Sequence, residues 1–524
     1  MKPLQFQPFY DRINASKSHE NVRKPCTLDM KKWEKTMYKP TRGQMTLFDQ
    51  PIAFAGAKLS PDNRWVKMAS LIPWDLLDRK YSEQFGSKTG YPAKAARMAL
   101  GSHIIKEKFR LSDEETVEHI KESPYLQWFI GLPAFTDKAP FDASTMTWFR
   151  KRLTPEMLAE VNAYVIGSKK KDDDEDPMNG SDSSDGGGDS ESEEGKNKGT
   201  LILDATCAPA DIKYPTDVAL LNTAREKLER MITELHGQTS QKKKPRTYKR
   251  IARKDYLRFA RNRKPTIKTI RKAIRQQLGY VRRDLAIIET LLQSGLNLTE
   301  KSKETLRIVR TLYSQQEEMY REKKHQVDDR IVSIHQPWVR PIVRGKTNAP
   351  TEFGAKIAIS MVDGYASVER LDWNAFNETS TLQESVERYR EERGYYPERI
   401  LADKIYRTRE NLSFCSKHGI RMNGPKLGRP PKDKKAYRLQ CLLEKSEAGE
   451  RNAVEGKFGE GKRAYGLNRI FTRRQDTSET SIHLVFLVMN MEKRLRSLLL
   501  PILEVLENMI SMLKIIKNRA LIGA

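Results

Sequence analysis

One segment of the chain, residues 172–194, cannot contribute to a folded core. It holds eleven Asp or Glu, no Lys or Arg, and Met178 as its only apolar side chain, among Ser and Gly. A segment of this composition buries too little surface to offset the chain entropy lost on folding. We therefore expect a disordered acidic linker over 167–199, which divides the 524-residue chain into separate folded parts.

The charge of the chain favours a polyanionic partner. Its 95 Lys and Arg against 69 Asp and Glu give a net charge of +26, which makes nucleic acid the first partner to consider. The sequence has no run of about eighteen apolar residues, so no membrane span is expected. The four cysteines form no C-x-x-C pair, and the first thirty residues lack the apolar core of a secretory signal. A cytoplasmic, nucleoid-associated protein is expected.

A helical domain is expected upstream of the linker, over 63–166, after a poorly defined segment over 1–62. Ser112 precedes Glu115 in the spacing of a helix cap, and a second helix starts near Ser144. The second helix is basic, so the two helices fit a helix-turn-helix-like DNA-binding domain. An amphipathic helix with a solvated basic face explains this segment at least as well when it is taken alone. The residues expected to contact DNA are Arg150 and Arg152.

A β-strand begins the part downstream of the linker. Residues 200–206 form a β-branched apolar run around Asp204, which is typical of a buried strand. The apolar residues that follow are spaced by three or four, which predicts a helical insertion over 217–350. Strand spacing returns at 356–373 on both sides of an Asp-Gly pair, the strongest short signal for a hairpin.

Helices and short strands alternate over the rest of the chain. The expected elements are, in order, a helix from Ser380 capped by Gln383, a strand over 399–402, a helix over 408–418, a strand over 420–423, a helix from about Glu447, and C-terminal helices over 476–524. Without the insertion, this order is that of the ribonuclease-H-like fold. The expected fold is therefore α/β, with a ribonuclease-H-like catalytic core over 200–216 and 351–475, interrupted by the long helical insertion and preceded by the all-α N-terminal domain.

The middle of the insertion is strongly basic. Residues 242–283 hold 18 Lys or Arg and one Asp, interleaved with aromatic residues. Lys and Arg displace counterions from a phosphate backbone, and flat rings stack on bases. A charge run is usually a solvated face, but its density over this segment favours DNA binding. The residues expected to contact phosphates are Arg250, Arg253, Arg258 and Arg261, and the Gly-Arg-Pro loop adds Arg429 as a weaker candidate for the minor groove.

Three carboxylates fall where the ribonuclease-H-like fold places its acids. Asp204 lies on the first strand, Asp403 follows the fourth, and a Glu lies on the helix after the fifth. Carboxylates in such a set can hold two divalent cations about 4 Å apart, which activate an attacking oxygen and neutralise a leaving one in phosphoryl transfer. Each acid alone is more often a turn former or part of an ion pair. Their joint occurrence in a basic protein favours a site.

Helix geometry selects the glutamate. Glu450, Glu455 and Glu460 are all available, but at about 100° per residue only Glu455 shares a face with Arg451 and Lys462. Val454 and Phe458 form the neighbouring apolar stripe that would seat the helix on the sheet. Glycines in the same segment weaken a helix, so Lys462 could lie beyond its end. These glycines are Gly456, Gly459 and Gly461.

Four segments of the chain resemble DDE transposases of bacterial insertion sequences, in the insertion-sequence-five group of the wider four-and-five superfamily. They are TLILDATCAPADIKYPTD, EFGAKIAISMVDGY, ERILADKIY and ERNAVEGKFGEGKRAYGLNRI, within a resemblance that covers about residues 45–490. The most specific motif is R-x3-E-x6-K, matched by Arg451, Glu455 and Lys462. The family often has a Tyr three residues before this Arg, where this chain has Ala448.

The resemblance implies a catalytic triad and its metal ions. Asp204, Asp403 and Glu455 would bind two Mg²⁺ or Mn²⁺ ions, while Arg451 and Lys462 would hold phosphates at a transposon end. The implied function is a transposase that binds terminal inverted repeats of double-stranded DNA, cleaves the 3′ ends and joins them to target DNA as a homodimer. Two other functions stay open: a catalytically inactive, repressor-like DNA-binding protein derived from a transposase, and a ribonuclease-H-like nuclease without strand transfer.

Overall fold

The computed structural model of the chain describes residues 53–54, 57–85, 92–167, 197–240, 242–343, 351–425 and 433–522. Most of the expected acidic linker and Arg429 lie outside these residues, so the expectations for them stay untested.

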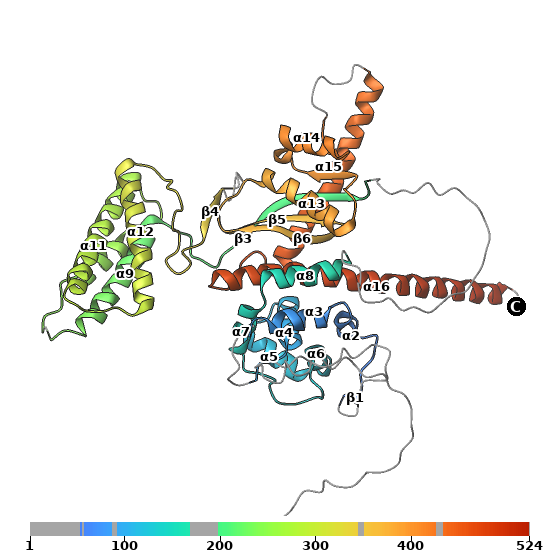
Figure 1. Cartoon of the computed structure of the whole chain (residues 1–524), viewed down its shortest axis with the longest axis horizontal. Helices are drawn as coiled ribbons and strands as arrows, with labels where there is room; N and C mark the ends of the chain where they lie inside the picture. The colour runs from blue at the N-terminus through green and yellow to red at the C-terminus, as the bar shows by residue number, and fades with distance from the viewer. Residues whose placement is uncertain are drawn as a thin grey trace, which may run out of the picture.

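A mixed β-sheet forms the centre of the molecule (Figure 1). Its six strands among the described residues are β3 (Thr200–Pro209), β4 (Arg340–Val343), β5 (Thr351–Val362), β6 (Tyr365–Asp372), β7 (Arg399–Ala402) and β8 (Arg421–Met422). The order is β4-β5-β3-β7-β8, and β6 also pairs with β5. β5 is antiparallel to β3, β4 and β6, while β7 is parallel to both β3 and β8. β4 falls within the expected insertion, yet it belongs to this sheet.

The hairpin predicted from the Asp-Gly pair is confirmed. β5 ends at Val362 and β6 begins at Tyr365, and their register pairs these two residues. Asp363 and Gly364 between them have φ angles of 52° and 75°. A two-residue turn needs positive φ at both positions to match the twist of its strands, and Asp followed by Gly adopts that geometry readily.

Helices cover both faces of the sheet. α13 (Thr381–Arg393) and α14 (Arg409–Lys417) pack on one face, where Leu201, Leu203 and Ile400 are buried. α15 (Lys434–Ala464) contacts β3 and β7, and its Val454 and Phe458 are buried as predicted. α15 begins well before the predicted start near Glu447.

The cap predicted for α13 is wrong. The Ser380 hydroxyl donates to the carbonyl of Asn377, and Gln383 donates to Asn411 instead of capping the helix. The short 3-10 helix η1 (Glu378–Ser380) precedes α13 directly and leaves the serine in a helical conformation. A capping side chain requires extended backbone at that position, so the pattern cannot act here.

The N-terminal domain is helical among its described residues after a small hairpin of β1 (Ala53–Phe54) and β2 (Ala57–Lys58). Its helices are α2 (Arg64–Ala69), α3 (Trp74–Ser82), α4 (Ala96–Phe109), α5 (Asp113–Glu122), α6 (Pro124–Phe129), α7 (Thr145–Arg152) and α8 (Pro155–Ile166). The predicted cap of α5 is confirmed, because Ser112 and Glu115 each accept the other's backbone N–H. This reciprocal cap satisfies two donors that a helix start otherwise leaves unpaired.

The last helix joins the N-terminal helices to the sheet. α16 (Gln475–Ile522) runs between them, alongside α8 (Figure 1). Apolar side chains from the N-terminal helices, β5, α15 and the first half of α16 form one continuous core. Glu492 of α16 also lies 2.8 Å from the guanidinium of Arg64 and 2.7 Å from the ammonium of Lys108. The N-terminal domain and the sheet therefore share a core.

A buried network of hydrogen bonds connects the elements at this junction. The amide nitrogen of Asn490 donates to Asn162 of α8 at 2.8 Å and to the carbonyl of Ala366 of β6 at 2.6 Å, while its oxygen accepts the N–H of Ala366 at 3.0 Å. Asn490 is fully buried and Asn162 nearly so. The side chain of Asn490 in α16 thus satisfies groups from two other elements, α8 and β6, that are distant from it in the sequence.

We expect Asn490→Ala to lower the free energy of unfolding by about 2 to 4 kcal/mol, because it leaves the N–H of Ala366 and the side-chain oxygen of Asn162 buried without the partners that Asn490 provides. Urea unfolding followed by circular dichroism would measure the change. Asn468→Ala, at an exposed position, is the matched control and should change stability by less than about 0.5 kcal/mol. Equal effects of the two substitutions would contradict the role assigned to Asn490.

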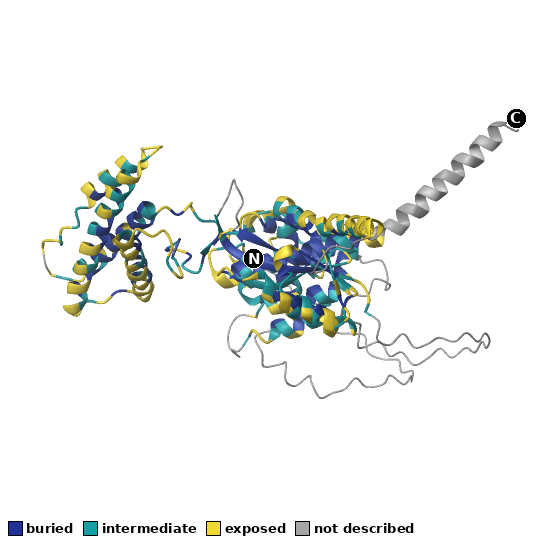
Figure 2. Ribbon diagram, turned by 90° about the horizontal axis from the view of Figure 1, so that it is seen from above, coloured by how far each residue is buried: buried dark blue, intermediate teal, exposed yellow. Residues whose placement is uncertain are grey.

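The insertion is a helical bundle with its own core. Its helices are α9 (Asp217–His236), α10 (Lys249–Ala260), α11 (Ile267–Gln293) and α12 (Glu300–Glu322). Buried apolar residues of α9, α11 and α12 pack together in a core separate from that of the sheet. Figure 2 shows this buried interior beside that of the main body, with many exposed residues on the bundle surface.

Candidate active site

The sheet brings Asp204 and Asp403 to one edge. Leu203 of β3 pairs with Ala402 of the parallel strand β7, so the two aspartates occupy the next positions of neighbouring strands. Equivalent residues of parallel strands point to the same side of a sheet. The N–H of Ala205 donates to Asp204 at 2.8 Å, and the N–H of Lys404 donates to Asp403 at 2.7 Å, at the start of the 3-10 helix η2 (Lys404–Tyr406).

Asp204 lies in an environment that opposes its ionisation. Burial raises the pKa of the Asp204 carboxyl, while the N–H of Ala205 and the guanidinium of Arg451 partly offset this effect. The neighbouring carboxylates Glu378 and Asp403 raise this pKa further. An added cation at this edge would relieve the repulsion and stabilise the ionised form.

Arg451 connects this edge to α15. Its Nη1 lies 3.7 Å from Oδ2 of Asp204, and its Nη2 lies 3.5 Å from Oε1 of Glu455. Successive side chains of a strand alternate between faces, so Asp204 points away from the α13 side where Leu203 is buried, toward α15. The guanidinium thus lies between two carboxylates of the predicted triad.

The contacts of α15 distinguish the three candidate glutamates. Glu450 forms an ion pair with Arg399 at 2.7 Å, and Arg399 also donates to the hydroxyl of Thr200. Glu460 lies 3.2 Å from Arg496 of α16. Of these three glutamates, Glu455 is the one whose arginine partner also reaches Asp204. Its side chain is 60% exposed, so it remains accessible to a substrate.

Lys462 lies inside α15, in its last turn, contrary to the expectation that glycines could end the helix before it. The buried side chains of Val454 and Phe458 hold the segment against the core. Gly461 allows α15 to approach Leu467 and Met489 closely, because a Cβ at this position would lie 3.3 Å from the side chains of both. Packing therefore compensates for the weak helix propensity of this stretch.

The donor chemistry of this edge suits Mg²⁺ or Mn²⁺, since both ions prefer carboxylate oxygens. Asp204 and Asp403 are neighbours in the sheet. The carboxylate of Glu455 pairs with the guanidinium of Arg451. Within the described part of the chain, no three or more His, Cys, Asp or Glu side chains lie close enough together to hold a metal ion. The residues fit such ions chemically, although the third carboxylate is engaged by a guanidinium.

Sequence reasoning missed a fourth acid beside this edge. Glu378, in the 3-10 helix before α13, lies 2.8 Å from the ammonium of Lys356 of β5, and both side chains are largely buried. Burial raises the pKa of the adjacent Tyr406 hydroxyl, and Glu378, Asp204 and Asp403 raise it further. Asn377 before Glu378 caps the short helix, and this Asn-Glu pair between a strand and a helix was the available signal.

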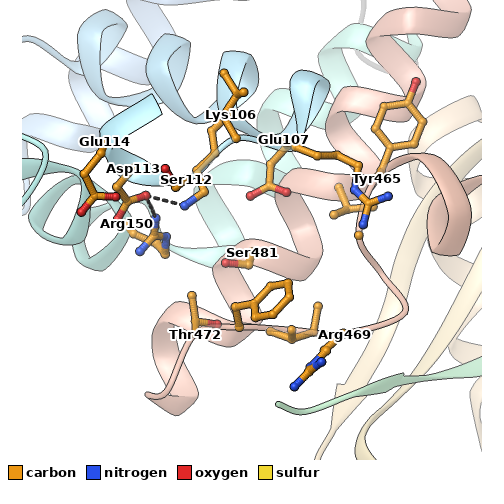
Figure 3. A pocket seen from close by; sticks show the side chains of 16 residues that line it. Lys106, Glu107, Ser112, Asp113, Glu114, Arg150, Tyr465, Arg469, Thr472 and Ser481 are labelled. Atoms are coloured by element: carbon orange, nitrogen blue, oxygen red, sulfur yellow. Dashed lines mark hydrogen bonds and ion pairs between the residues drawn. The ribbon is translucent and has the colours of Figure 1, made fainter. Parts of the chain in front are cut away.

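Arg150 is engaged inside the protein. It is 6% exposed, and its Nη2 lies 3.0 Å from Oδ1 of Asp113, which also binds Lys106 (Figure 3). The three side chains line a cavity of about 450 Å³ between the N-terminal helices and the loop before α16. Arg150 therefore ties α7 to α5, and its position does not support the expected contact with DNA. Arg152 is half-buried, with its guanidinium 4.4 Å from the ring centroid of Phe85.

The basic residues predicted on the insertion lie together on α10. They line a shallow groove of about 540 Å³ with Lys254 and Leu257. All four arginine side chains are exposed, and Arg258 has a weak ion pair with Asp255 at 3.6 Å. The four residues are Arg250, Arg253, Arg258 and Arg261.

Two parts of the chain match family models of transposase domains. Residues 400–492 match the family described as "Transposase DDE domain", and this match includes Asp403, Arg451, Glu455 and Lys462. Residues 54–152, which form most of the N-terminal helical domain, match the family described as "Transposase domain (DUF772)".

One curated relative matches a shorter part of the chain. It is the "Uncharacterized protein ORF8 in nfe locus" of Rhizobium meliloti, 40% identical over 123 residues, which are 24% of this chain. The match spans 58% of the length of that relative. No solved structure matches the chain. Within the described residues, no helix is both long and apolar enough to cross a membrane. The two domain matches support a transposase of an insertion element.

Proposed function

We propose that the chain binds the terminal inverted repeats of an insertion sequence of the insertion-sequence-five group, cleaves their 3′ ends and transfers them to target DNA. The observation that carries the proposal is the placement of Asp204 beside Asp403, with Arg451 of α15 in contact with both Asp204 and Glu455. The strand order supports a ribonuclease-H-like core, because, with the extra strand β4 set aside, the antiparallel strands β3, β5 and β6 are followed by β7 and β8, which run parallel to β3.

Asp204, Asp403 and Glu455 would hold two Mg²⁺ or Mn²⁺ ions. When bound there, the ions would activate the attacking oxygen and neutralise the negative charge that develops on the leaving oxygen. Arg451 has a further role, because a guanidinium that is shared by two carboxylates can exchange one of them for a phosphate in the same forked geometry. Lys462, about three turns along the same helix, would contact the next phosphates.

The proposal includes the DNA contacts and the assembly. The N-terminal helices would recognise the repeat, and the basic groove of α10 would bind phosphates irrespective of sequence. Two transposon ends have to be held together for transfer, so the active form would be a homodimer on double-stranded DNA.

A strand-transfer assay tests the proposal. Inverted repeats in the DNA that flanks the gene would supply the ends, offered as pre-cut duplexes with a free 3′ hydroxyl together with a supercoiled plasmid and Mg²⁺. We expect the end to become joined to the plasmid. Nicking without joining would indicate a nuclease, and binding without either reaction would indicate a repressor-like protein; both results contradict the proposal.

The choice of glutamate has its own test. Glu455→Gln should reduce cleavage by at least about a hundredfold, because it removes one of the three charged oxygen ligands. Glu450→Gln is the matched control on the same helix, and it should cost less than about twofold, since it removes an exposed ion pair with Arg399. Rates of end cleavage under single-turnover conditions would measure both. Comparable losses in the two variants would contradict the assignment of Glu455.

A further inference from the structure

α7 presents a tryptophan to solvent. Trp148 is 55% exposed, while Met146 and Phe149 of the same helix are buried in the N-terminal core. Large aromatic side chains left exposed on a protein surface are enriched where partners bind, since they add contact area at little cost in conformational entropy. The apolar side of α7 is already packed by its neighbours, so Trp148 is not needed to seat the helix.

Cations surround this ring. The ammonium of Lys151 lies 4.4 Å from the ring centroid of Trp148, and the guanidinium of Arg152 lies 6.0 Å from it. Asp476, at the start of α16, is the acid whose charge acts on Lys151, and it already pairs with Arg474 at 2.7 Å. The ring is therefore the apolar centre of a surface with an excess of positive charge.

We infer that Trp148, Lys151 and Arg152 form a contact surface for double-stranded DNA. The indole would pack against deoxyribose and base edges in a groove, while the two cations would bind the flanking phosphates. This assignment rests on the proposed function, because it names the part of the N-terminal domain that meets the DNA. In place of Arg150, which is buried against Asp113, the inference assigns the contact to the exposed Trp148 and to the two cations beside it.

The charge of the surface favours DNA over a second protein surface. Phosphates complement Lys151 and Arg152, whereas a second copy of this chain, with its net charge of +26, would bring further positive charge to the contact. The match to a transposase domain also extends through α7 to Arg152.

The test uses the full-length chain and a random-sequence duplex of about 30 base pairs, three helical turns, in fluorescence anisotropy titrations at several salt concentrations. Trp148→Ala should weaken binding about tenfold with an unchanged salt slope, because an apolar contact releases no counterions. Lys151→Gln should instead reduce the slope of log affinity against log salt by up to about 0.9. Trp148→Phe should keep most of the affinity, since it keeps an aromatic ring.

Phe135→Ala is the matched control, because Phe135 is an aromatic residue of the same domain that is 39% exposed. It should leave the affinity for DNA unchanged. If Trp148→Ala binds DNA as tightly as this control, or if it lowers the sedimentation mass of the DNA-free chain, the inference is wrong. These results are separable from the proposed function, because the strand-transfer assay reports on joining and the titration reports on binding alone.

Discussion

Replacement of Asp204 by Asn is expected to abolish cleavage of end DNA while leaving the affinity for that DNA within about threefold. The substitution removes the charged oxygens that would hold the metal ions, but it keeps the size and the hydrogen-bonding shape of the side chain. Gel assays of cleavage and of binding on the same duplex would measure the two effects. Cleavage that persisted in this variant would contradict the catalytic assignment.

The same substitution should leave the fold at least as stable at neutral pH. Burial, Glu378 and Asp403 raise the pKa of Asp204 above its value in the unfolded chain. The stability that the protonated carboxyl contributes is therefore lost as the pH rises from the unfolded-state pKa through the folded-state pKa. Ionisation of the wild-type carboxyl group therefore carries a cost that Asn does not have. Asp211→Asn is the control, because it removes an acid that pairs with Arg469 away from Asp403, and it should leave cleavage intact.

Replacement of the four exposed arginines of α10 by Gln is expected to weaken binding to transposon-end and random DNA by similar factors, about a hundredfold each. These side chains line one groove, and nothing in their near-continuous basic sequence is spaced to contact base edges. The slope of log affinity against log salt should fall by up to about 3.6, if each arginine contributes one phosphate contact. The variant carries Arg250→Gln, Arg253→Gln, Arg258→Gln and Arg261→Gln.

A matched variant on α12 controls for the loss of charge. Its basic side chains are exposed as well, but three of them pair with Glu300, Glu304 and Glu289, so they are already neutralised. Their replacement should change the salt slope little. If the α10 variant lost only its preference for transposon ends, with the random-DNA affinity unchanged, the insertion would read sequence. The control variant carries Lys301→Gln, Lys303→Gln, Arg307→Gln and Arg310→Gln.

The predictions from sequence succeeded where the information is local. The β-branched run around Asp204, the Asp-Gly turn and the four-residue spacing of Arg451 and Glu455 each depend on neighbours within one element. Their positions followed from the periods of strands and helices. The position of Asp403 was also predictable, because the strand before it is short and apolar.

Other features could not be read from the sequence because they depend on partners that are distant along the chain. Arg150 is buried because Asp113, 37 residues earlier, neutralises it, and no pattern within α7 reveals that pair. Glu378 lies beside the acidic edge and pairs with Lys356 of β5, which is distant from it along the chain. Burial and ion pairing of this kind are set by the tertiary fold.

The shared core around α16 explains how the chain tolerates a long acidic segment between α8 and β3. Gly167 ends α8 beside α16, and Asn197 is fixed separately, by a hydrogen bond to the carbonyl of His418 at 2.8 Å. The two ends of the segment are thus held in place by contacts that do not involve the segment. The cost of closing such a loop grows only with the logarithm of its length, about 0.6 kcal/mol for each doubling. A change in the length of this stretch should therefore leave the arrangement of the N-terminal helices and the acidic edge of the sheet the same.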